Sequence, residues 1–197
     1  MKFNVSEITD VIRSRRTIFP KDFTERKVHR ELVEKILNNA LWAPNHGMTQ
    51  PWRFKVFQGD ALPELAERLA EIYKRITPQD LFLQRKFDNN KKRPLQSSVV
   101  IAVCMEPGTK GSIPEIEEVE AIACAVQNMG LTATAYGLGT FWSTGKVIYS
   151  DELKEYLGLP DQGKCLGLIY IGYPSKEWPK GYRKPLEYFT EWIGKEE

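Results

Sequence analysis

Two continuously apolar runs set the strongest limit on how this chain can fold. Residues 98–105 read SVVIAVCM, and residues 165–172 read CLGLIYIG. Alternating apolar and polar residues are typical of a strand with one face in water, whereas an uninterrupted apolar run is typical of a strand covered on both faces. The two runs therefore predict buried central strands, with other elements packed on both sides of a sheet.

Helical patterns precede the first of these runs. Ser6 is the predicted cap of a short helix that ends at a basic cluster, and Thr24 is the predicted cap of a second helix that ends at Pro44. Asp60 opens a third helix, with apolar residues in helical phase as far as Ile76. Each of these helices has an apolar stripe that can cover a sheet.

The second half of the chain contains a longer helix, over residues 115–136. It is apolar nearly all round and rich in small residues, which suits a buried helix and a contact between subunits. A further short helix begins at Ser150 and is stopped by Gly158 and Pro160.

Shorter segments complete the pattern. Strands are predicted at residues 53–57 and 140–142, and the charged segment 78–94 is either a helix or a loop. The tail, residues 173–197, is rich in Pro, Lys and aromatic residues, and we expect it to pack on a partner subunit. The order of elements predicts one α+β domain over residues 1–197, with a small central sheet flanked by helices.

Composition excludes several classes of protein. The 28 basic residues nearly balance 26 acidic ones and form no block, which argues against nucleic acid as the main partner. The first ten residues lack the apolar core of a signal peptide, and no apolar run reaches the roughly 20 residues of a membrane span, so we expect a cytoplasmic protein. Cys104, Cys124 and Cys165 form no close pair in the sequence and stand in apolar runs. With two histidines in the chain, this pattern indicates buried structural thiols rather than a disulfide framework or a metal site.

The segment Arg13–Thr17 contains three arginines and two hydroxyl side chains in five residues. Such a cluster can be a solvated helix end, where cations complement the helix dipole. It also suits a phosphate group, because guanidinium groups make bidentate contacts and hydroxyl groups complete the shell.

Two other segments mix groups that suit a ligand. The segment Trp42–Trp52 holds two tryptophans, two prolines, a histidine and two amides, so it is either a structural loop or the lining for a planar heteroaromatic ring. The segment Gly137–Gly145 lacks the third glycine of a dinucleotide fingerprint, but its glycines permit close approach of a ligand. No nucleophile elbow, Walker loop or zinc motif is present, so redox chemistry would have to come from a cofactor.

Three blocks of the sequence, in this order, resemble the FMN-dependent nitroreductase family. They are Arg15–Thr17, then Ala43-Pro44 with Gln50–Trp52, then Gly137–Gly139 with Trp142. The form of the second block is similar to that of the short-chain bacterial NAD(P)H nitroreductases. The resemblance runs from about residue 8 to residue 190. It implies an α+β fold and a tight, intertwined homodimer, with FMN in each of two pockets between the subunits.

The resemblance also implies roles for particular residues. The basic segment would hold the phosphate and ribityl chain, and the tryptophan-rich loop would line the flavin. The glycine segment would present backbone groups to the ring near the atom that takes hydride, and one late arginine would meet the phosphate. These residues are Arg15, Arg16 and Thr17; Trp42, Asn45 and His46; Trp142, Ser143, Thr144 and Gly145; and Arg183.

By the same similarity, electrons would pass from NAD(P)H through FMN to small acceptors such as nitroaromatics or quinones, with ping-pong kinetics and no obligatory protein acid or base. Two positions depart from many family members: Met48 stands in place of an asparagine, and Phe19 in place of a basic residue for which Arg13 or Arg183 would substitute. The alternatives are an FMN-binding or sensing protein without turnover, a family branch with other chemistry such as dehalogenation, and an α+β domain without a cofactor.

Overall fold

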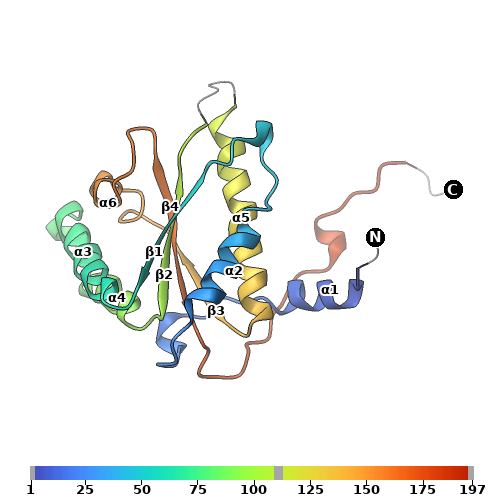
Figure 1. The fold of residues 1–197 in the computed structure, drawn as a ribbon, viewed down its shortest axis with the longest axis horizontal. Helices are drawn as coiled ribbons and strands as arrows, with labels where there is room; N and C mark the ends of the chain where they lie inside the picture. Colours follow the sequence, from blue (N-terminus) through green and yellow to red (C-terminus); the bar gives the residue numbers. More distant parts are fainter. Residues whose placement is uncertain (1–2, 109–112, 195–197) are drawn as a thin grey trace.

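The computed structural model describes residues 3–108 and 113–194, which form a sheet with helices on both faces (Figure 1). The helices are α1 (Val5–Ser14), α2 (Arg30–Ala40), α3 (Ala61–Ile76), α4 (Gln84–Leu95), α5 (Glu115–Ala135) and α6 (Asp151–Tyr156). The strands are β1 (Trp52–Gln58), β2 (Val99–Met105), β3 (Gly139–Ser143) and β4 (Lys164–Gly172). Short 3-10 helices lie at Pro20–Asp22, His46–Met48, Gln79–Leu81 and Leu186–Tyr188. The predicted α+β class is confirmed. Within the described ranges, no helix is both long and apolar enough to cross a membrane.

The two apolar runs are the central strands, as predicted. The strand order is β1-β2-β4-β3 and every neighbouring pair is antiparallel. Every residue of β2 is buried, because α2 and α5 cover one face of the sheet, and α3 and α6 cover the other (Figure 1).

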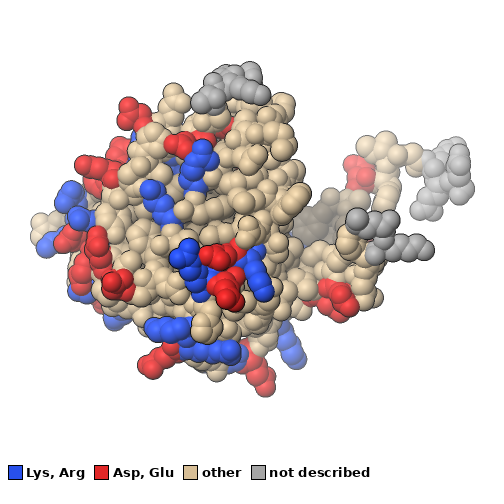
Figure 2. All heavy atoms as spheres, viewed as in Figure 1, with Lys and Arg blue, Asp and Glu red and all other residues tan. Residues whose placement is uncertain are grey.

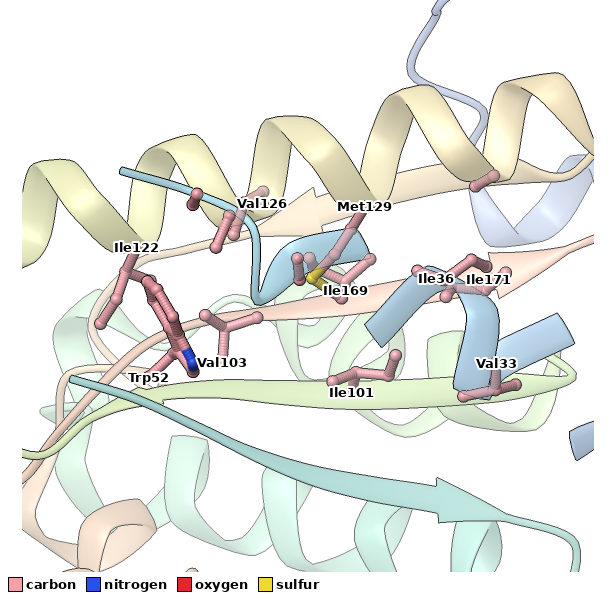
Figure 3. Close-up of a cluster of buried hydrophobic side chains, with 14 of the residues drawn as sticks. Val33, Ile36, Trp52, Ile101, Val103, Ile122, Val126, Met129, Ile169 and Ile171 are labelled. Carbon is pink, nitrogen blue, oxygen red and sulfur yellow. The ribbon is translucent and has the colours of Figure 1, made fainter. Parts of the chain in front are cut away.

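The α5 helix packs on the sheet through one face. Ile122, Val126 and Met129 belong to one buried cluster with the central strands; Met129 points toward Ile169, and Ile122 lies beside Trp52 (Figure 3). The predicted bounds of this helix are confirmed to within one residue, but the expectation of a thiol buried at Cys124 is wrong for the single chain. Helix geometry turns Ala123 and Cys124 away from the sheet, so both side chains are exposed. Cys104 and Cys165 are buried as expected.

The predicted starts of the first two helices are wrong. Asn4, not Ser6, caps α1, because its side-chain oxygen accepts hydrogen bonds from the amides of Ser6 and Glu7 at 3.1 and 3.4 Å. Thr24 donates its amide to Tyr173, so the chain stays extended there and α2 begins only at Arg30.

Other expectations are confirmed or decided. The third helix begins directly after Asp60, and Ser150 caps α6 by accepting a hydrogen bond from the amide of Leu153 at 3.2 Å. The charged segment that could have been a loop forms the helix α4. An ion pair of 2.6 Å between Lys91 and Glu67 joins α4 to α3.

The described part of the tail is held to the body only near its start. Ser175 and Lys176 bond to Asp22 at 2.9 and 2.7 Å, and the indole of Trp178 donates to the carbonyl of Ser14. Farther along, the tail leaves the body, and Trp192 is 84% exposed (Figure 1). Its expected packing on a partner stays a prediction, as does the division of the chain into one domain with an extension.

Candidate functional site

The basic segment, Arg13–Thr17, spans the end of α1 and contacts α5 near its C-terminal end and the start of β3. A Cβ added to Gly130 of α5 would lie 3.2 Å from the Arg15 side chain, so the absence of a side chain there gives Arg15 its place. Thr17 forms a bridge with Thr140, and the next amide donates to the Thr140 carbonyl at 2.9 Å. The segment is therefore fixed to the edge strand of the sheet.

The two predicted phosphate arginines differ in their contacts. The Arg16 guanidinium donates to the carbonyls of Pro179, Arg13 and Arg15 at 3.0, 2.6 and 2.8 Å. The Arg16 side chain thus caps the end of α1 and holds the tail. Gly181 of the tail lies so close to the guanidinium that a Cβ at residue 181 would overlap it. Within the described ranges, the Arg15 guanidinium makes no hydrogen bond or ion pair. Arg15 therefore has more donors left for an anion.

The last residue of β3 is followed by backbone groups suited to a planar ring. Among the described residues, the amides of Thr144 and Gly145 donate to no carbonyl oxygen. Gly145 has a φ of +123°, which favours glycine. Trp142 is 42% exposed and lies over Gly167 of β4. This edge offers an aromatic face together with donors for the polar rim of a ring.

Gly167 is required for the position of Trp142, because a Cβ at residue 167 would overlap the indole. We expect Gly167→Ala to displace Trp142 and to cost about 1–3 kcal/mol of stability through overpacking. Gly172→Ala is the matched control, since its Cβ would overlap Phe23 instead. Both variants should unfold at lower temperature, but only Gly167→Ala should weaken flavin binding beyond its effect on stability. Equal flavin affinity in the two variants would remove Trp142 from the site.

The tryptophan-rich loop lies near the start of α5. Asn45 accepts the Gln50 amide at 3.0 Å, and His46 Nδ1 lies 2.5 Å from a carboxylate oxygen of Glu117. Met48 and Gln50 have φ values of 55° and 47°, a conformation that side chains other than glycine rarely adopt. The loop therefore holds a strained backbone conformation. Trp42, just after α2, is 85% exposed. Met48, the first departure from the family pattern, is 72% exposed.

The predicted residues fall into two separate groups in one chain. Arg15 contacts α5 at Gly130, whereas His46 contacts it at Glu117, which is about 20 Å away along the helix at 1.5 Å per residue. Arg183 lies two residues after Gly181, which packs against Arg16. Its exposed guanidinium donates to the Tyr182 carbonyl at 2.7 Å. In one chain, the residues predicted to bind the phosphate and those of the edge strand β3 therefore lie near the C-terminal end of α5. The tryptophan-rich loop lies near its N-terminal end.

The structure adds a contact of β3 that the sequence did not predict, on the face of the sheet opposite to Trp142. The Arg93 guanidinium of α4 lies 5.0 Å from the ring centroid of Phe141, the neighbour of Trp142. Phe19, the second departure, packs on the same ring at 4.9 Å. Arg93 thus brings a positive charge to β3 from a helix whose pattern gave no signal for it.

These groups fit a phosphorylated flavin in chemistry. Arginines and a hydroxyl group suit the phosphate, and the amides after β3 suit the polar rim of the ring. A cavity of about 440 Å³ between α6 and β4 lies elsewhere: none of the residues predicted to bind flavin is among those lining it in the described structure. That cavity is therefore separate from the predicted flavin-binding residues.

Comparisons with known proteins identify the family and the fold. A family model described as the nitroreductase family matches residues 12–173. YfhC of Bacillus subtilis, provisionally named an NAD(P)H nitroreductase, is 28% identical over 188 residues, which cover 94% of each chain. A nitroreductase-like protein from Bacillus cereus superposes with a TM-score of 0.80 at 28% identity, over 98% of each chain. A protein from Desulfovibrio desulfuricans, provisionally named a nitroreductase and solved with FMN, has a TM-score of 0.73 at 26% identity, over 98% of this chain and 100% of its own.

Proposed function

Because the chain belongs to the nitroreductase family, we propose that it is a homodimeric, FMN-dependent oxidoreductase that takes electrons from NAD(P)H and delivers them to small acceptors such as nitroaromatics or quinones. The observation that carries the proposal is the position of the predicted residues in two groups at opposite ends of α5. Two copies of the chain would bring the loop of one to the edge strand of the other. The cytoplasmic location expected from the sequence stays a prediction.

Two relatives support the choice of cofactor and donor. The Desulfovibrio protein, which shares the fold over nearly the whole chain, was solved with FMN. The name of the Bacillus subtilis relative gives NAD(P)H as the electron donor. We transfer both to this chain as part of the proposal.

The chain's own residues bind and orient the cofactor. In this proposal Arg15 and Thr17 would bind the phosphate, and Arg183 would approach it from the tail. The amides of Thr144 and Gly145 would donate to the ring and stabilise negative charge on it, because preformed donors act without reorganisation. Trp42, Asn45 and His46 would come from the partner subunit's loop. When bound, FMN supplies the redox chemistry by accepting hydride from NAD(P)H and passing electrons to the acceptor.

A second copy would also cover apolar surface that one chain leaves open. The α1 helix has an apolar stripe but no buried residue, and Val5, Ile8 and Ile12 are 48–73% exposed. The Lys, Arg, Asp and Glu side chains crowd the side of α3 and α4, whereas the upper part of the face over α5 is mostly uncharged (Figure 2). An uncharged face with an unpartnered amphipathic helix is typical of a subunit interface.

Spectroscopy separates this proposal from a binding or sensing role. The purified protein should be yellow, NAD(P)H should bleach the flavin band under anaerobic conditions, and a quinone or nitroaromatic should restore it. A yellow protein that does not bleach would be a flavin binder without turnover. A colourless protein that takes up no added FMN would rule the proposal out.

The cysteines should not take part in turnover. Catalytic thiols are partly exposed and electropositive, whereas Cys104 and Cys165 are buried in the sheet. Cys104→Ala and Cys165→Ala should lower stability by leaving small cavities, and each FMN-loaded variant should keep quinone reduction within a few-fold of the parent. Cys124→Ala serves as the control for an exposed position. Loss of turnover at a normal flavin content in any of the three variants would show a thiol mechanism.

A further inference from the structure

Two of the cysteines lie side by side on the central strands. Cys104 of β2 and Cys165 of β4 are register partners in the antiparallel pair. Their side chains are 0% and 4% exposed and belong to the same apolar cluster, on the face covered by α3 and α6. The proposed function leaves this pair unused.

A β-bulge creates the pair. Val103 stands opposite Gly167, but the next residue of β2, Cys104, stands opposite Cys165, so β4 has one additional residue at this point. That residue, Leu166, packs in the cluster on the α5 face, whereas Cys165 faces the α3 side. Without the bulge, Leu166 would lie opposite Cys104.

The backbone geometry permits a bond between the two sulfurs. Directly opposed residues of antiparallel strands have Cα atoms about 4.5–5.5 Å apart. Disulfides need a Cα separation of about 4.4–6.8 Å. The Cys165 thiol donates a hydrogen bond to the Gly167 carbonyl at 3.7 Å, beside the bulge. Oxidation would therefore require little movement of either strand.

Cys165 is also within reach of a small reagent. It lines the cavity of about 440 Å³ between α6 and β4, whose wall includes Ser150, Lys154 and Gly163. Interaction with the neighbouring Cys104 thiol lowers the pKa of Cys165, although burial acts in the opposite direction. Interaction with the Cys165 thiol and burial both raise the pKa of Cys104. Cys165 is accordingly the attacking sulfur, and Cys104 keeps its proton longer.

We propose that Cys104 and Cys165 form an oxidation site, a dithiol that hydrogen peroxide converts to a cross-strand disulfide. In the first step, the Cys165 sulfur attacks one peroxide oxygen, the O–O bond breaks, and the product is a sulfenic acid and water. In the second step, the Cys104 sulfur attacks the Cys165 sulfur, the S–S bond forms, and the S–O bond breaks to release a second water. The two sulfurs together lose two electrons, and both peroxide oxygens leave as water.

The test uses full-length protein with its bound flavin and the substitution Cys124→Ser, which leaves only the two core thiols. The folded protein is treated with hydrogen peroxide, quenched, denatured and alkylated, and then analysed by intact mass and non-reducing peptide mapping. We expect no alkylated cysteine, and a peptide that links residue 104 to residue 165 and is two hydrogens lighter than the two reduced peptides together. The exposed Met48 reports on the oxidant, since it should become a sulfoxide. The parent chain is mapped in parallel, so the test holds even if Cys124→Ser folds poorly.

A second variant tests the order of the steps. With Cys104→Ala added, the sulfenic acid at Cys165 has no resolving thiol, so dimedone should label Cys165 in this variant and not in the Cys124→Ser protein. The proposal is overturned if Met48 is oxidised while both core thiols remain alkylatable. It is also overturned if Cys165 proceeds to a sulfinic acid while Cys104 stays reduced in the same molecule.

Discussion

Arg15→Ala should raise the dissociation constant for FMN about tenfold to a hundredfold, because a hydrogen bond to a charged group contributes about 1.5–3 kcal/mol. Arg15 is anchored beside Gly130 and makes no hydrogen bond or ion pair within the described ranges. Its removal should therefore leave folding nearly unchanged. Equilibrium dialysis of FMN, paired with thermal unfolding of the apoprotein, measures both quantities.

Arg16→Ala should weaken FMN binding at least as much, both by removing a phosphate contact and by loosening the local structure. Equilibrium dialysis and thermal unfolding separate the two effects. Its guanidinium donates to the carbonyls of Arg13, Arg15 and Pro179, so its loss should also loosen the end of α1 and the start of the tail. We expect a lower unfolding temperature for Arg16→Ala than for Arg15→Ala. Arg85→Ala, at an exposed position on α4, controls for the loss of one positive charge. If both variants bind FMN like the Arg85 control, the basic segment is merely a helix end.

Local sequence patterns predicted the parts of the fold that depend on neighbouring residues. The β2 and β4 strands are continuous apolar runs, so their burial follows from composition alone. The cap at Ser150 was also predictable, because it acts on an amide three residues away. In contrast, α2 starts late because Thr24 is held by Tyr173, a residue far along the chain. No local pattern contains that contact.

The sequence named candidate site residues, which stay a prediction, but it did not indicate their division in space. Spacing along the chain does not reveal that His46 and Arg15 contact opposite ends of α5. Arg93 was missed for a similar reason, since its position over Phe141 depends on how α4 docks against the sheet. Cys124 points outward because of how α5 is rotated about its axis. Small residues occur on several faces of this helix, so the sequence did not show which face packs on the sheet.

A negative charge on the outward face of α5 should separate the proposed dimer and release its flavin. Ala123 is exposed in one chain and small enough to allow a partner helix to approach closely. In Ala123→Glu the interface would have to bury an unpaired carboxylate, which costs several kcal/mol. We therefore expect the dimer dissociation constant to rise by at least about a hundredfold.

Analytical ultracentrifugation with absorbance at the flavin band follows both consequences at once. The parent should sediment as a yellow dimer at low micromolar concentration, whereas Ala123→Glu should sediment as colourless monomer or unfold. Gln84→Glu adds the same charge to an exposed position on α4, on the other side of the sheet, and should behave like the parent. Circular dichroism tells a folded monomer from an unfolded chain. A folded Ala123→Glu monomer that retains FMN would show that one chain completes the site alone, which would refute the two-chain pocket.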